Sequence, residues 1–136
     1  MTAQAELSLA SELRLGARAS ELADARDYAA AAAAAFGLSP DDSYDFVYAV
    51  NEAVTNAIRH GAPDEQGQIV LSVSTVGERL VFSVRDFGTF AMSAPTSAAN
   101  PEGGRGFALM EQLVDDVQVQ ADRDGTTVTL SKARIG

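Results

Sequence analysis

The sequence contains no cysteine and only one histidine, His60. Without cysteine, the chain can form neither a disulfide framework nor a metal site with thiolate ligands. The single histidine also excludes a metal site built from several imidazoles. Hydrophobic residues make up 46% of the 136 residues and charged residues 21%, which is an ordinary soluble globular composition. We therefore expect one domain over residues 1–136 with its own core.

Long apolar runs and basic residues are also scarce. The run Ala29–Phe36 is mostly alanine and is far shorter than a membrane span of roughly 20 residues, so no membrane segment is expected. The N-terminus has Glu6 and Glu12 but no cationic start, so we expect no signal peptide and a cytoplasmic protein. The net charge of −9 repels phosphate backbones, which argues against direct nucleic-acid binding. A bound nucleotide would therefore need local positive charge or backbone N–H groups.

The N-terminal quarter predicts an extended arm followed by a helix. Leucines at positions 7, 9, 13 and 15 share one parity, which is typical of an edge strand. Residues 17–36 are rich in alanine, the strongest helix former, and Gly37 is suited to end that helix.

A second helix is predicted to begin at Ser39 and to run to about His60. Ser39 suits the N-cap, Pro40 suits the first helical position, and Gly61 suits the C-cap. An apolar stripe at helical spacing predicts the buried face of this helix. The stripe consists of Phe46, Val50, Ala53 and Ala57.

The second half of the chain is rich in strand patterns. Strands are predicted at 69–76, 80–86, 117–121 and 126–130, in two hairpins. Residues 87–105 have no period, and an irregular stretch of that length is usually functional, for example as a lid. A short helix is predicted over 107–114. Together these elements predict an α+β fold, a two-layer sandwich with helices on one face of a mainly antiparallel sheet.

The first candidate site lies on the second helix. Glu52 and Asn56 are four residues apart, so they project from one face. Asn56 offers an oxygen ligand for a hard cation such as Mg²⁺. Glu52 can accept a proton from a hydroxyl group or a water molecule. A solvated helix face explains the same pair when it is taken alone.

The second candidate is Asp86-Phe87-Gly88, at a predicted strand end. The aspartate can accept a hydrogen bond from an exocyclic amine such as that of adenine, and Gly88 would let a flat ring approach the backbone. A plain turn that closes a strand is the better explanation of these residues when they are taken alone. The same tripeptide occurs in ordinary protein kinases, but the other parts of that signature are missing here.

The third candidate is the glycine-rich stretch Gly103–Phe107 before a predicted helix. Its glycines would expose backbone N–H groups to an anion, and Arg105 could add positive charge. The alternative is a flexible loop. The stretch is neither a Walker A loop, since the lysine is missing, nor a Rossmann fingerprint, since no βαβ unit surrounds it.

The fourth candidate is Gly125-Thr126-Thr127, before the last predicted strand. The Thr126 hydroxyl could join a water network beneath a purine. A hairpin turn followed by a β-branched strand explains the same residues in isolation.

The order of the four motifs resembles that of the GHKL ATPase superfamily. Within it, the stretch Glu52–Ile58 followed by His60-Gly61 resembles the anti-sigma-factor serine/threonine kinases. The resemblance covers nearly the whole chain. It implies ATP and Mg²⁺ as cofactors, a sigma factor and a STAS-type antagonist as protein partners, and a possible homodimer.

The resemblance also implies residue roles. Glu52 would be the general base for the serine hydroxyl of the partner, and Asn56 would coordinate Mg²⁺. Asp86 would bind the adenine amine, with Gly88 giving the ring access and Thr126 completing the adenine pocket. The phosphates would be bound by Gly104, Arg105 and Gly106.

Two features keep alternatives open. The family usually has a second glycine at the place of Phe90, and the lid is short. Phe90 favours a nucleotide-gated binding module of the same fold without kinase activity, whereas Glu52 opposes it, since a mere binder needs no base. The short lid would loosen the retention of ATP. Arg26 resembles a position on the partner-binding face of the family, although a solvated arginine on an acidic protein explains it equally well.

Overall fold

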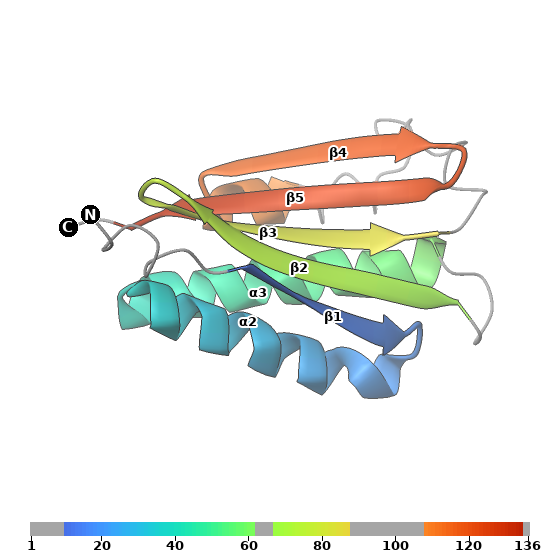
Figure 1. Cartoon of the computed structure of the whole chain (residues 1–136), viewed down its shortest axis with the longest axis horizontal. Helices are drawn as coiled ribbons and strands as arrows, with labels where there is room; N and C mark the ends of the chain where they lie inside the picture. The colour runs from blue at the N-terminus through green and yellow to red at the C-terminus, as the bar shows by residue number, and fades with distance from the viewer. Residues whose placement is uncertain (1–9, 62–66, 88–107, 135–136) are drawn as a thin grey trace.

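The computed structural model describes residues 10–61, 67–87 and 108–134. Its strands form one antiparallel sheet in the order β1-β2-β3-β5-β4, and helices α2 and α3 cover one face of that sheet (Figure 1). The strands are β1 Ala10–Gly16, β2 Gln68–Val76, β3 Arg79–Asp86, β4 Asp116–Asp122 and β5 Gly125–Ala133. The helices are η1 Ala19–Glu21, α2 Leu22–Phe36, α3 Pro40–Asn56 and the π-helix η2 Ala57–Gly61. Residues 108–113 are also helical. The predicted two-layer α+β sandwich is confirmed.

The hairpins form as predicted, because their turns need only local residues. Val76 lies opposite Arg79, so Gly77 and Glu78 make a two-residue turn. Gly77 has φ +60°, a conformation that suits glycine. The predicted edge strand is confirmed over Ala10–Gly16, which pairs with β2 at the edge of the sheet. The leucines at positions 7 and 9 lie outside the described residues.

The first long helix begins later than expected, at Leu22 instead of Ala17. A short 3₁₀ turn precedes it, and the Glu21 carboxylate accepts hydrogen bonds there from Arg18 Nη2 at 3.0 Å and from the Gly16 N–H at 3.4 Å. These contacts turn the chain from β1 into the helix. The helix ends as predicted at Gly37, whose φ is +94° and whose N–H donates to the Ala33 carbonyl.

Helix α3 begins as predicted and ends differently. The Ser39 hydroxyl accepts a hydrogen bond from the Asp42 N–H at 3.1 Å, and Pro40 is the first helical residue. The α-helical geometry stops at Asn56 and passes into a π-helix, so the expected α-helix to His60 is wrong for its last turn. The predicted buried stripe is confirmed over its whole length.

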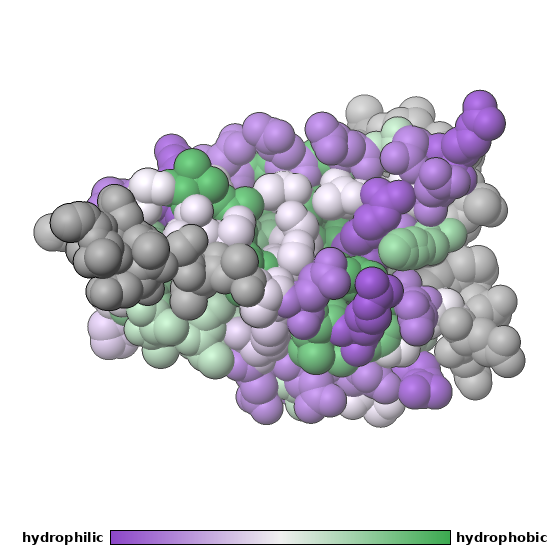
Figure 2. Space-filling model, in the orientation of Figure 1, coloured by the Kyte–Doolittle hydropathy of each residue, from purple (hydrophilic) through white to green (hydrophobic). Residues whose placement is uncertain are grey.

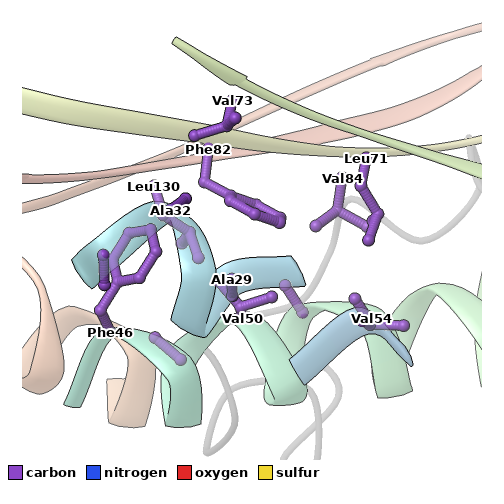
Figure 3. Close-up of a cluster of buried hydrophobic side chains, with 14 of the residues drawn as sticks. Ala29, Ala32, Phe46, Val50, Val54, Leu71, Val73, Phe82, Val84 and Leu130 are labelled. Carbon is purple, nitrogen blue, oxygen red and sulfur yellow. The ribbon is translucent and has the colours of Figure 1, made fainter. Parts of the chain in front are cut away.

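The core lies between the two helices and the sheet (Figure 3). The Phe46 ring meets the Phe82 ring edge to face at a centroid distance of 5.8 Å, and Tyr28 contacts Phe82 at the same distance. The alanines of α2 that face this core are buried, which lets α2 pack closely on its neighbours. The alanine-rich helix is therefore a packed element of the core.

The other face of the sheet is polar. Ser83 and Thr129 lie opposite each other on β3 and β5, with their hydroxyl oxygens 3.4 Å apart. Pale and purple residues, which carry hydroxyl or charged groups, cover much of this face in Figure 2. One apolar face and one polar face are what an antiparallel sheet with a single helical layer requires. Among the described helices, none has the length and hydropathy needed to cross a membrane.

The Ser39 cap gives a first prediction. Ser39→Ala removes the acceptor for the Asp42 N–H and should lower the free energy of unfolding by about 1 kcal/mol, measured by urea denaturation. Ser39→Asp keeps an acceptor at the same place and should retain the stability of the wild type. Equal losses in both variants would show that the hydrogen bond does not stabilise α3.

Candidate functional site

Helix α3 presents Glu52 and Asn56 one turn apart on a half-exposed face. Ala53 and Val54, which lie between them in sequence, are 1% exposed and face the core. The helical period therefore turns the carboxylate and the carboxamide away from the core. Within the described part of the chain, no hydrogen bond involves the side chain of Glu52 or of Asn56. The oxygens of both side chains are therefore available to a ligand or a substrate.

The α-helix widens directly after Asn56. The π-helix η2 follows and contacts β3, which brings this end of the helical layer to the sheet. Figure 1 shows that the end of α3 and the end of β3 at Asp86 lie at the same end of the molecule. Isolated π-turns of this kind occur often at functional sites. The side chain of His60 lies outside the described part.

The carboxylate of Asp86 is buried at the end of β3. Its side chain shares the core-facing parity of Phe82 and Val84 and is 5% exposed. The Thr126 N–H donates a hydrogen bond to Asp86 Oδ1 at 3.3 Å. A buried carboxylate is costly unless it is hydrogen-bonded, and the Thr126 N–H supplies such a bond to Asp86.

Gly125 makes this geometry possible. Its φ is +146°, and a Cβ at this position would lie 1.9 Å from the Asp86 carbonyl oxygen and 2.8 Å from Phe87 Cα. Only glycine lets the start of β5 approach the end of β3 so closely. Sequence reasoning noted Gly125 as part of a turn but missed this contact. A glycine before threonine at a hairpin turn was the available signal.

Arg85 and Phe87 occupy the opposite face of the sheet from Asp86. The Arg85 guanidinium lies 5.1 Å from the centroid of the Phe87 ring, and its Nη1 donates to Thr127 Oγ1 at 2.8 Å. These contacts hold both neighbours of Asp86 on the outer face. Because successive side chains of a strand alternate, the Asp86 carboxylate must then point toward the helices.

The predicted site residues divide into two groups. Asp86 and Thr126 are in contact, and Asn56 lies at the same end of the molecule, one turn from Glu52. The rest lie outside the described residues, as do Phe90 and nearly all of the predicted lid. The residues of this second group are Gly88, Gly104, Arg105 and Gly106. The roles of both groups stay predictions.

Sequence reasoning did not anticipate a groove on the outer side of the helical layer. The groove has a volume of about 370 Å³. It is lined by Arg26, Tyr44, Val47, Tyr48, Asn51 and Glu52. Arg26 Nη1 donates to Asn51 Oδ1 at 3.1 Å and so joins α2 to α3 along one wall. The available signal was the spacing of Tyr44 and Tyr48 on the side of the helix away from its apolar stripe.

The close contact at Gly125 gives a second prediction. Gly125→Ala forces a Cβ into the Asp86 backbone and should lower the free energy of unfolding by roughly 3 kcal/mol or more. Gly77→Ala is the matched control, because its φ is also positive but its Cβ would meet open space. The control should lose only about 1–2 kcal/mol. Equal losses by urea denaturation would contradict the steric argument.

Comparison with known proteins identifies the family of the chain. Residues 15–132 match the family model of the histidine kinase-like ATPase domain. Serine-protein kinase RsbW of Bacillus mycoides (strain KBAB4) is 31% identical, in a match that covers 89% of this chain and 82% of that protein. RsbW of Bacillus cereus (strain Q1) is 30% identical with the same coverage.

Two solved structures have the same fold as this chain. The crystal structure of the RsbU and RsbW domains of Rv1364c from Mycobacterium tuberculosis superposes with a TM-score of 0.71 at 26% identity, over 94% of this chain and 34% of that one. This chain therefore spans about a third of that protein. The histidine kinase domain of the blue-light activated kinase from Erythrobacter litoralis EL346 shares the fold, with a TM-score of 0.57, 23% identity, and coverage of 82% of this chain and 60% of that one. The chain belongs to the histidine kinase-like ATPase domain family and, within it, to the serine-protein kinases represented by RsbW.

Proposed function

We propose that this protein transfers the γ-phosphate of ATP to a serine or threonine of a STAS-type antagonist and also sequesters a sigma factor. The proposal rests on how four polar residues are arranged at one end of the molecule. A carboxylate and a carboxamide, Glu52 and Asn56, lie one turn apart on α3, at the end of the molecule where Asp86 and Thr126 form a buried acceptor site. Membership of the RsbW group supports the same reaction.

The adenine would bind at the end of β3. Its amino group would donate a hydrogen bond to the Asp86 carboxylate, beside Thr126 at the start of β5. The burial of Asp86 strengthens such a bond, because water does not compete for the carboxylate there. We assign the phosphates to Gly104, Arg105 and Gly106, with Gly88 giving the ring access, on the resemblance to the family alone.

The chemistry of Asn56 suits Mg²⁺. This cation prefers oxygen ligands and is usually held by one or two protein groups together with phosphates and water. Asn56 offers one carboxamide oxygen on a half-exposed face, which fits that need. When bound, Mg²⁺ would neutralise charge on the phosphates.

Glu52 would act on the acceptor hydroxyl. Its carboxylate would accept the proton as the hydroxyl oxygen bonds to the γ-phosphorus, while the bond from the γ-phosphorus to the β–γ bridging oxygen breaks and ADP leaves. The half-exposed position of Glu52 allows a protein substrate to reach it. The sigma factor, the antagonist and a homodimer are assigned from the family.

Adenine recognition gives a third prediction. Asp86→Asn removes a charged acceptor and should weaken ATP and ADP alike, by about 10- to 100-fold, measured by calorimetric titration. The preference for ATP over GTP should fall as well, because guanine has a carbonyl in place of the amine. Unchanged ATP and ADP affinities would reject the placement of the adenine at Asp86.

The base assignment gives a fourth prediction. Glu52→Gln should lower the rate of phosphate transfer by about 100-fold or more, while ADP affinity stays at the wild-type value. The substrates for this assay are purified STAS-domain proteins from the source organism, used with radiolabelled ATP. Glu12→Gln is the control, since Glu12 is exposed on edge strand β1. Equal transfer by wild type and Glu52→Gln would show that Glu52 is not the base. If wild type binds ATP but transfers no phosphate, the nucleotide-gated binding module is the better description.

A further inference from the structure

The Arg85 side chain contacts three strands on the outer face of the sheet. Its Nη1 donates a hydrogen bond to Thr127 Oγ1 of β5 at 2.8 Å, and its Nη2 lies 3.8 Å from Asp122 Oδ1 of β4. Its guanidinium also lies over the ring of Phe87, which directly follows β3. Figure 1 shows that β3 ends, and β4 turns into β5, at the same end of the molecule. Arg85 therefore connects these strands at the end where the adenine is proposed to bind.

Of these contacts, the hydrogen bond to Thr127 contributes most. The Asp122 side chain is 59% exposed, and an ion pair of 3.8 Å with such a partner is screened by water and contributes little. The Arg85 side chain is only 33% exposed, and its charged donor lies at a favourable distance from the threonine oxygen. The bond to Thr127 is therefore the contact that holds β5 beside β3.

This bond lies directly beside the buried pair of the proposed adenine site. Arg85 and Thr127 are partners in the register of β3 and β5, and Asp86 and Thr126 form the next and last pair of that ladder. The Thr126 N–H reaches Asp86 Oδ1 at 3.3 Å, slightly beyond the roughly 2.7–3.2 Å that is usual for such a bond. Because the pair is at the end of the ladder, a small separation of the two strands would break this bond. The Arg85–Thr127 bond opposes that separation.

We propose that Arg85 is a positioning residue for adenine recognition. By holding the start of β5 against the end of β3, it keeps the Asp86 carboxylate in the orientation that accepts a hydrogen bond from the amino group of adenine. It acts through Thr127, from the face of the sheet opposite the carboxylate. The inference rests on the proposed function, in which adenine binds at Asp86, and adds a residue that does not itself touch the nucleotide.

A comparison of two nucleotides tests the inference. Purine riboside triphosphate has the ring of ATP without the amino group, so it cannot donate to Asp86. Arg85→Ala should weaken ATP about fivefold and the analogue less than twofold, measured by calorimetric titration. A smaller folded fraction would weaken both nucleotides by the same factor, so their ratio separates positioning from stability. Equal losses for the two nucleotides, or no loss for ATP, would overturn the inference.

Arg79→Ala is the matched control. Arg79 lies on the same strand and the same face as Arg85, and its Nη1 donates to Ser131 Oγ of β5 at 3.1 Å, at the other end of β3. This variant loses the same kind of bond far from the proposed site, so it should keep the wild-type ratio of the two affinities. A fall of that ratio as large as in Arg85→Ala would count against a local effect and overturn the inference.

The partner side chain provides a second variant, which also serves if Arg85→Ala does not fold. Thr127→Val keeps a β-branched side chain of similar size and removes only the acceptor. It should lower the preference for ATP over the analogue as Arg85→Ala does, and combining the two changes should lower it no further. An unchanged preference in Thr127→Val, or additive effects in the double variant, would show that Arg85 does not act through this bond.

These titrations need no phosphate transfer, so the inference can fail separately from the proposed function. Asp86→Asn is measured beside the other variants. If Asp86→Asn lowers the preference for ATP over the analogue and Arg85→Ala does not, Arg85 is not a positioning residue, while the placement of the adenine stands. If Asp86→Asn keeps the wild-type preference, the placement of the adenine is wrong and the inference fails with it.

Discussion

The packing of α3 against the sheet is the constraint on which the rest of the structure depends. Phe46 meets Phe82 edge to face at the centre of the core, and the apolar stripe of α3 continues from that contact along the helix. Once this stripe is buried, the rotation of the helix about its axis is set. Glu52 and Asn56 then have to emerge on the open side, and the two groove tyrosines emerge on the outer surface.

The end of β3 shows how a polar site is made at the margin of an apolar core. The core-facing positions of β3 are apolar until the last one, which is a carboxylate. A hydrogen bond from the Thr126 N–H stabilises it, and the close approach of β5 that supplies this donor needs glycine at position 125. The site therefore depends on a backbone contact between two strands as much as on the side chain of Asp86.

A division of tasks follows along α3. Its buried stripe packs on the sheet, its C-terminal turn carries Asn56 at the end of the molecule where β3 ends, and its outer stripe presents Tyr44 and Tyr48. Glu52 lies where the last two surfaces meet. This position would let one carboxylate act as the proposed base and also be reached by a protein substrate.

The sequence by itself determined the features that depend on near neighbours: the Ser39 cap, the Gly37 C-cap, the Gly77 turn and the buried stripe of α3. Each follows from a residue preference or a period within a few positions. The sequence also placed Asp86 and Thr126 at two strand ends, but only the pairing of β3 with β5 brought them into contact. The late start of α2 also has a local cause, the contacts of Glu21 with Gly16 and Arg18, which the helix propensities of the region do not reveal. Tertiary structure alone decided the close contact of Gly125 and the groove between α2 and α3. These two features join residues that are far apart in the chain, and no local preference encodes the distance at which packed elements meet.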